Sequence, residues 1–272
     1  MTTPYPPPVD KLLTYGDCRE MPQDTDYLVL GLGPEHIPDL IRMATDEELH
    51  SADSDTLDVW APVHAWRALG QLRAEAAIEP LLSQLRRVDE ENDDWTGEEL
   101  PRVFAQIGPP AIPALAAYLA DPTRGEFARA AAASSLEEIG KACPDSTPTC
   151  ADILSRQLER FSANSPTING LLVASLLHLG AIEAAPIMER AFVAQAVDLS
   201  VVGDWEDVQI RLGLGARRDT LHGNHGPAAP ELPVGMAAPR RQKQSHVGDI
   251  RRTLDPWDAE KRKQGNKKKH KR

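Results

Sequence analysis

Apolar residues recur at spacings of three and four from about Val9 to Leu214, and strand-like alternation is nearly absent. Leu81, Leu82 and Leu85 form one such face, and Leu115 and Leu119 form another. These spacings place side chains on one face of a helix. The pattern therefore predicts an all-α fold.

Internal repetition is the second pattern. Four segments, at residues 32–38, 72–80, 107–113 and 179–186, join a turn to a following helix, and a fifth closes a helix in the same way. Their anchors are Gly33, Arg73, Gly108, Gly140 and Gly180. The steps of 40, 35, 32 and 40 residues are typical of helix-pair repeats. Because one pair cannot bury its apolar face alone, we expect a right-handed α-solenoid of about five HEAT-like pairs over residues 9–214.

Turn and capping residues support these boundaries. Glycine favours the left-handed position after a helix, and proline suits the first turn of the next helix. The spacing of Thr45 and of Thr96 before glutamates predicts two capping boxes. Ser165 before a proline predicts a third helix start.

Two consecutive segments, residues 66–70 (WRALG) and 78–82 (IEPLL), resemble a HEAT-type repeat. Over about residues 10–214 the chain also resembles a bacterial family of unknown function built from such repeats. The segments that carry this resemblance are residues 12–16 (LLTYG), 60–65 (WAPVHA), 99–101 (ELP) and 203–208 (GDWEDV). The resemblance implies a helical-repeat fold and no established activity. Many members end in a cysteine-rich SEC-C zinc motif, of which residues 265–271 keep only the basic part, so it implies no zinc site here.

Charge divides the chain of 272 residues into an acidic body and a basic tail. Residues 240–272 contain 13 Lys/Arg and 4 Asp/Glu, a net charge of +9, and the other 239 residues carry −20. Such a tail is typical of a segment that meets nucleic acid or an acidic partner, or of a solvated end. We predict a Pro-rich disordered N-terminus at 1–8, a Pro/Gly linker at 215–239, and a mostly disordered basic tail at 240–272.

No apolar run approaches the roughly 20 residues of a membrane span. The Pro-rich start, Met1 to Pro8, lacks the basic-then-apolar order of a signal peptide. These features predict a cytoplasmic protein without membrane contact.

Cysteine and histidine usage offers little for metal or cofactor chemistry. The three cysteines, Cys18, Cys143 and Cys150, provide neither a disulfide framework nor four zinc thiolates. A bridge between Cys143 and Cys150 is sterically open, but without an export signal we expect reduced thiols. His64 is interpreted as a packing or hydrogen-bonding residue. We therefore predict no cofactor, no metal ligand and no catalytic residue.

Two acidic, tryptophan-bearing segments are candidate partner sites. They comprise Asp93, Asp94 and Trp95, and Asp204, Trp205, Glu206 and Asp207. An exposed aromatic ringed by carboxylates suits capture of a basic peptide. The alternative is structural: Trp95 and Leu100 would staple a helix start capped at Thr96, and Asp204 would cap the helix that follows it.

Three hypotheses for function remain. The first is a non-enzymatic scaffold whose solenoid surface binds a protein or basic peptide. The alternative is a nucleic-acid-associated protein that uses the basic tail. An enzyme similar to the HEAT-like chromophore lyases is the weaker third, because none of their motifs can be placed in this sequence.

Overall fold

The computed structural model describes residues 4–53 and 55–215, and this part of the chain is helical without a β-strand. The α-helices are Ile37–Ala44 (α1), Glu47–His50 (α2), Ala61–Gln71 (α3), Ile78–Gln84 (α4), Arg87–Glu90 (α5), Asp94–Ile107 (α6), Ile112–Ala120 (α7), Glu126–Ala142 (α8), Thr147–Leu158 (α9), Pro166–His178 (α10), Ala185–Val193 (α11), Leu199–Val202 (α12) and Trp205–Arg211 (α13). The 3-10 turns are Val9–Thr14 (η1), Leu28–Leu30 (η2), Pro34–His36 (η3), Asp58–Trp60 (η4), Glu75–Ala77 (η5), Pro109–Ala111 (η6), Pro144–Ser146 (η7) and Ile182–Ala184 (η8). The prediction of an all-α fold is confirmed for these residues.

The repeated turn segments share one local structure. In each, a 3-10 turn (η3, η5, η6, η7 or η8) continues directly into an α-helix. Gly108 and Gly180 have φ of 90° and 65°, as expected after a helix. The prediction of a helix-ending glycine is wrong at Gly33, whose backbone is extended, and at Gly140, which lies within α8. In the segment at residues 72–80, the residue with a positive φ is Arg73, at 50°.

Two predicted helix starts are displaced. α2 is capped by Asp46 rather than Thr45, and α6 by Asp93 rather than Thr96. Each aspartate accepts backbone N–H groups of the first turn, which a carboxylate does well because it complements the positive end of the helix. The start at Ser165 is confirmed, since its hydroxyl accepts the N–H of Ile168.

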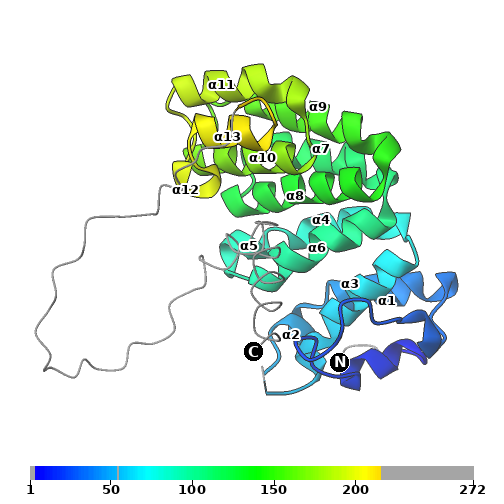
Figure 1. The fold of residues 1–272 in the computed structure, drawn as a ribbon. Coiled ribbons are helices and arrows are strands. Elements are labelled where there is room, and N and C mark those ends of the chain that lie inside the picture. The colour runs from blue at the N-terminus through cyan, green and yellow to red at the C-terminus, as the bar shows by residue number, and fades with distance from the viewer. Residues whose placement is uncertain (1–3, 54, 216–272) are drawn as a thin grey trace, which may run out of the picture.

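The longer helices form two layers (Figure 1). α3, α6, α8 and α10 contact one another in chain order, and we call this row of helices the inner layer. α1 packs on α3, and α4 packs on α6. α7 packs on α8, and α9 packs on both α8 and α10. Each helix of the inner layer is therefore backed by a helix that lies close to it in sequence.

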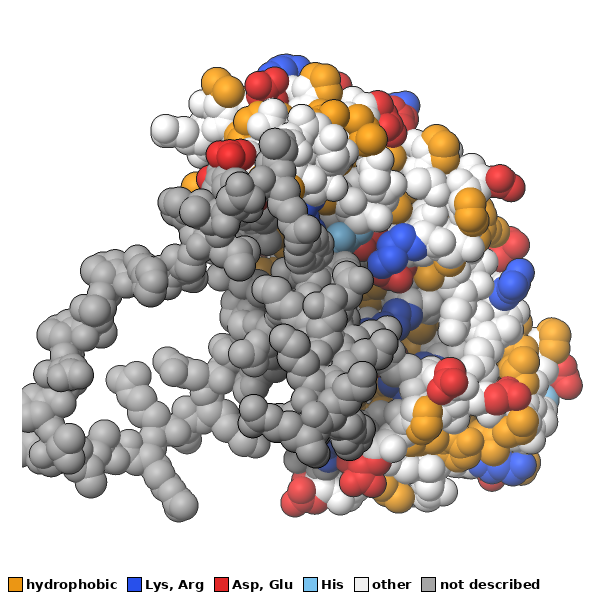
Figure 2. Space-filling view, viewed as in Figure 1, with side chains coloured by type: hydrophobic (Ala, Val, Ile, Leu, Met, Phe, Trp, Pro, Cys, Tyr) orange, Lys and Arg blue, Asp and Glu red, His pale blue; other side chains and the backbone are white. Residues whose placement is uncertain are grey.

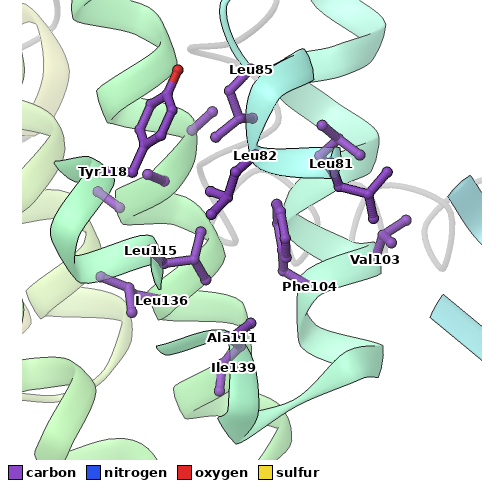
Figure 3. Packing of buried hydrophobic residues seen from close by; sticks show 14 of the residues in the cluster. Leu81, Leu82, Leu85, Val103, Phe104, Ala111, Leu115, Tyr118, Leu136 and Ile139 are labelled. Carbon is purple, nitrogen blue, oxygen red and sulfur yellow. The ribbon is translucent and has the colours of Figure 1, made fainter. Parts of the chain in front are cut away.

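The apolar core runs between the two layers. Figure 3 shows Leu82 of α4 and Leu115 of α7 on one side of Phe104 of α6, Leu81 of α4 on its other side beside Val103, and Leu136 of α8 near Leu115. Phe104, Leu115 and Leu136 are fully buried. Leu81, Leu82 and Leu115 are among the residues that the helical spacing places on apolar faces, and all three are buried, so the pattern and the packing agree.

The N-terminal segment covers α3. The Gln71 side chain accepts the N–H of Tyr27 at 2.9 Å and donates to the carbonyl of Thr25 at 2.7 Å. Of the segment predicted to be disordered, residues 4–8 are described, and there the Tyr5 hydroxyl donates to Asp46 at 2.6 Å. As a result every residue of α3 except Gln71 is buried, which is unusual for a helix in a two-layer fold.

A distant carboxylate caps α8. Asp89 accepts the N–H groups of Phe127 and Ala128 at 3.0 and 2.7 Å, although it lies on α5. The N-cap residue of α8, Gly125, has no side chain that could cap the helix. A Cβ at this position would lie 2.1 Å from the Asp89 carboxylate, so glycine leaves room for that carboxylate. The start of α8 is thus built from two parts of the chain.

Within the described residues no single helix has both the length and the apolar character needed to cross a membrane. The bent pair Asp94–Ile107 and Pro109–Ala120, which meet at 116°, passes that test by length and composition. The predicted tail at 240–272 and the predicted linker beyond residue 215 lie outside the described residues.

Candidate functional site

The first acidic segment forms the start of α6. Asp93 accepts from the Thr96 N–H at 3.3 Å and from its hydroxyl at 2.8 Å, and it pairs with Arg87 at 3.4 Å. Trp95 lies in the first turn, half-buried, with its ring edge-on to Trp60 at 5.1 Å. The predicted staple with Trp95 preceding the cap is therefore wrong, because the helix begins at Asp94.

The second acidic segment forms the start of α13. Asp204 accepts the N–H of Asp207 at 2.9 Å, and the Asp207 carboxylate accepts the N–H of Asp204 at 3.1 Å. This reciprocal capping box confirms the predicted helix start at Asp204. Trp205 is half-buried against Phe192, with ring centroids 5.6 Å apart, and Glu206 is exposed. The structure thus places the seven candidate residues at the starts of two helices. At each start the tryptophan packs against an aromatic ring from another element.

Three of the segments that carry the family resemblance meet at α3. His64 lies at the centre, fully buried, and its Nε2 is 2.9 Å from the carbonyl oxygen of Gly16. A carbonyl oxygen only accepts, so Nε2 carries the proton and Nδ1 accepts from the Tyr27 hydroxyl at 2.9 Å. His64 therefore joins α3 to the N-terminal segment, as the interpretation of a hydrogen-bonding residue predicts.

Burial keeps this cluster uncharged. Burial lowers the pKa of His64 from its ordinary 6.5 to about 4, although the hydrogen bond to Gly16 acts in the opposite direction and raises this pKa. Cys18 lies 3.4 Å from Nδ1, and burial raises the pKa of its thiol to about 12. A thiol in this state is a poor nucleophile, because the thiolate is the reactive form. The cluster thus holds the N-terminal segment in place and lacks an activated sulfur.

We expect His64 to make stability depend on pH. Between pH 6.5 and 4 the unfolded chain binds a proton at this residue and the folded chain does not. Stability is therefore complete above pH 6.5 and falls as the pH drops, by about 1.4 kcal/mol per pH unit from this group. His64→Gln, which keeps a donor and an acceptor, should show a slope shallower by that amount in urea titrations from pH 7 to 4.5. Equal slopes for the two proteins would contradict the assignment.

A buried ion pair joins α3 to α6. Arg67 donates to both oxygens of Glu99, at 3.0 Å from Nε and 2.7 Å from Nη2. Burial opposes the charge on Arg67, but the hydrogen bonds and the charge of Glu99 raise its pKa. Arg102, one turn further along α6, approaches the same carboxylate at 3.6 Å with a half-exposed side chain. One buried carboxylate is thus shared by two guanidinium groups.

A second buried carboxylate joins α8 to α10. Glu137 accepts from His178 Nδ1 at 2.8 Å and from Lys141 Nζ at 3.3 Å. Lys141 also donates to Glu138 at 2.6 Å and is half-exposed. The Nε2 atom of His178 is buried without a hydrogen-bond partner in the described part of the chain. The carboxylate therefore orients the imidazole, which is nine-tenths buried.

The six residues of these two clusters lie on four successive helices of the inner layer, and we call them the charged row. It consists of Arg67, Glu99, Arg102, Glu137, Lys141 and His178. In Figure 2 basic side chains and one histidine gather down the middle of the visible face, with acidic side chains beside them. The row therefore exposes mainly Arg102 and Lys141, because Arg67, Glu99, Glu137 and His178 are each at least nine-tenths buried. The described residues as a whole carry a net −20, from 15 Lys/Arg and 35 Asp/Glu.

The charged row was missed in the sequence, although a signal exists. Glu137 follows Glu99 by 38 residues, and Lys141 follows Arg102 by 39. These steps match the repeat period, so aligning the repeats by charge as well as by glycine and proline would have found the equivalence. His178 gives no such signal, since its partner becomes evident only when α8 and α10 pack.

Metal ligands do not gather in the described residues, where no group of three or more His, Cys, Asp or Glu side chains is placed to hold an ion. All three cysteines are free, so Cys143 and Cys150 are not bridged. Cys143 is half-buried, whereas Cys18 and Cys150 are buried.

Comparison with known proteins gives no relative for this chain: no family model, no curated protein and no solved structure matches it. The resemblance to HEAT-like repeats therefore remains a prediction from the quoted segments.

Proposed function

We propose that the chain is a HEAT-like α-solenoid that acts as an interaction scaffold, with the inner layer receiving a segment of a partner protein. The observation that carries this proposal is the charged row, which crosses four adjacent helices. Stacked helix pairs have long faces that run across successive helices, and proteins use such faces for binding. Arg102 and Lys141 keep about half of each side chain exposed, so they are placed to pair with carboxylates of the partner segment, while its Lys and Arg side chains meet the acidic residues around the row.

The partner segment is basic overall and also contains carboxylates. The described residues carry −20, a charge that attracts Lys and Arg at long range and orients the encounter. Asp94 and Glu206 add carboxylates beside Trp95 and Trp205 at the two helix starts. The chain's own residues 240–272, at +9, have the composition of such a segment and would compete for this surface at high effective concentration.

A defined peptide tests the proposal. A labelled peptide of residues 240–272, added to a chain that ends at Leu214, should bind in an anisotropy titration. High salt should weaken this binding about tenfold, as for loss of two surface ion pairs of about 0.7 kcal/mol each. In the full chain the tethered tail should reduce binding of the added peptide. No binding at low salt would contradict the proposal.

Matched variants test the acidic segments. Asp94→Asn and Glu206→Gln together remove two charges and keep the shape of each side chain, so peptide affinity should fall, and the unfolding midpoint of each variant, measured in parallel, separates this effect from a loss of stability at the helix starts. Unchanged affinity would assign both segments to helix starts alone. An RNA or DNA oligonucleotide that binds the full chain but not the shortened one would instead favour the nucleic-acid function.

A further inference from the structure

A cavity of about 300 Å³ lies at the edge of the inner layer, where α3, α6 and α8 end one above another. Its lining comes from three successive turns of the repeat. These residues are Arg73, Ala105, Gln106, Ile107, Gly108, Pro109, Ala142 and Cys143. Neither the charged row nor the acidic helix starts contribute to it, so the proposed scaffold function does not account for this cavity.

The backbone of Arg73 has a left-handed conformation, which is more common for glycine than for arginine. Its φ of 50° is left-handed, a region that side chains with a Cβ adopt at a cost. Gly180 occupies the equivalent position, since the next residue in each turn makes the same hydrogen bond: Ala74 N–H to Leu69, and Ala181 N–H to Leu176. Gln195, with φ of 54° and an Ala196 N–H to Ala191 hydrogen bond, occupies a third such turn, so a side chain with a Cβ is tolerated there at some cost. At position 73 this turn places an arginine at the cavity.

The polar side chains of the cavity are free to bind. Within the described residues the side chains of Arg73 and Gln106 make no hydrogen bond or ion pair, and both residues are exposed. Gln106 instead lies against Gly70 of α3, where a Cβ would be 2.2 Å from its oxygen. A guanidinium fork and an amide therefore reach one cavity from two neighbouring turns.

We propose that this cavity binds a carboxylate on a small aliphatic group, such as an acidic side chain or the chain end of a peptide. The Arg73 guanidinium matches a carboxylate with two parallel hydrogen bonds, and the Gln106 amide can donate a third. Ile107, Pro109 and Ala142 supply an apolar wall for the aliphatic part. Such a wall suits a carboxylate better than a phosphate, whose oxygens all need polar partners.

Cys143 provides a reporter inside the cavity. It is half-exposed at the lining, while Cys18 and Cys150 are buried and serve as internal references. Isovalerate, added in excess to the full chain at matched ionic strength, should slow alkylation of Cys143 by iodoacetamide. At about twice the dissociation constant the site is two-thirds filled, so the rate should fall about threefold. Peptide mass spectrometry measures each cysteine separately.

Arg73→Gly separates binding from folding, because the two effects have opposite signs. Removing the left-handed strain should raise the melting temperature by about 2 °C, while protection by isovalerate should be lost. Arg73→Lys keeps the charge and the strain but loses the fork, and should retain only part of the protection.

Three results would overturn the inference. They are unslowed alkylation with isovalerate, equal protection by uncharged isovaleramide, and full protection in Arg73→Gly. Equal protection by inorganic phosphate would overturn the carboxylate class. None of these results depends on the basic peptide, so failure here and failure of the scaffold proposal are distinguishable.

Discussion

Glu99→Ala is expected to lower the free energy of unfolding by about 3–5 kcal/mol, because it leaves the buried Arg67 guanidinium without its carboxylate. Both side chains are more than nine-tenths buried, so water cannot replace the lost partner. Arg102 loses its ion pair as well. Urea unfolding followed by circular dichroism measures the change, and the folded baseline shows whether the variant still folds.

Two controls make this result specific. Glu79→Ala removes an exposed carboxylate from neighbouring α4 and should change stability by less than about 0.5 kcal/mol. Arg67→Met combined with Glu99→Leu replaces both charges with apolar groups and should recover most of the loss, since no unpaired charge remains. A loss below about 1 kcal/mol for Glu99→Ala alone would mean that water reaches the pair.

Leu115→Ala is expected to destabilise the fold by about 2–5 kcal/mol, the range for a fully buried leucine. Its side chain lies in the core between α4, α6 and α8 (Figure 3), where the surrounding helices cannot easily collapse on the space left behind. Urea unfolding at constant pH provides the measurement.

Val193→Ala is the matched surface control, because Val193 on α11 is 79% exposed. This truncation should change stability by less than about 0.5 kcal/mol. If Leu115→Ala were equally mild, Leu115 would be on the surface and the helical phase assigned to α7 would be wrong.

Local chemistry explains why much of the fold could be predicted. The turns at Gly108 and Gly180 follow from residues adjacent in sequence, as does the capping box of Asp204. The same local reasoning placed two caps at Thr45 and Thr96, where aspartates nearby, at 46 and 93, act instead. Competition between neighbouring capping residues depends on where the helix axis lies, and packing decides that.

The candidate site could be predicted only in part. Trp95 and Trp205 were found as residues, but their ring partners Trp60 and Phe192 lie on other elements. The charged row and the cavity at Arg73 are formed by residues from separate segments that come together only when the helices pack. The sequence of one segment alone therefore does not predict them. The aligned repeat anchors already show arginine at position 73 where the others have glycine, but they do not show the cavity that Arg73 lines.

The remote cap on α8 has a consequence for how the chain folds. In arrays of repeats each unit contributes its own stability plus an interface with the next, so units can come apart one at a time. Here Asp89 completes the first turn of a helix that begins 37 residues later, at Glu126. Losing α5 would strip α8 of two hydrogen bonds at its start, and α8 contacts α6, α7, α9 and α10. We therefore expect the middle of the described chain to unfold as one cooperative unit, with fraying at its two ends.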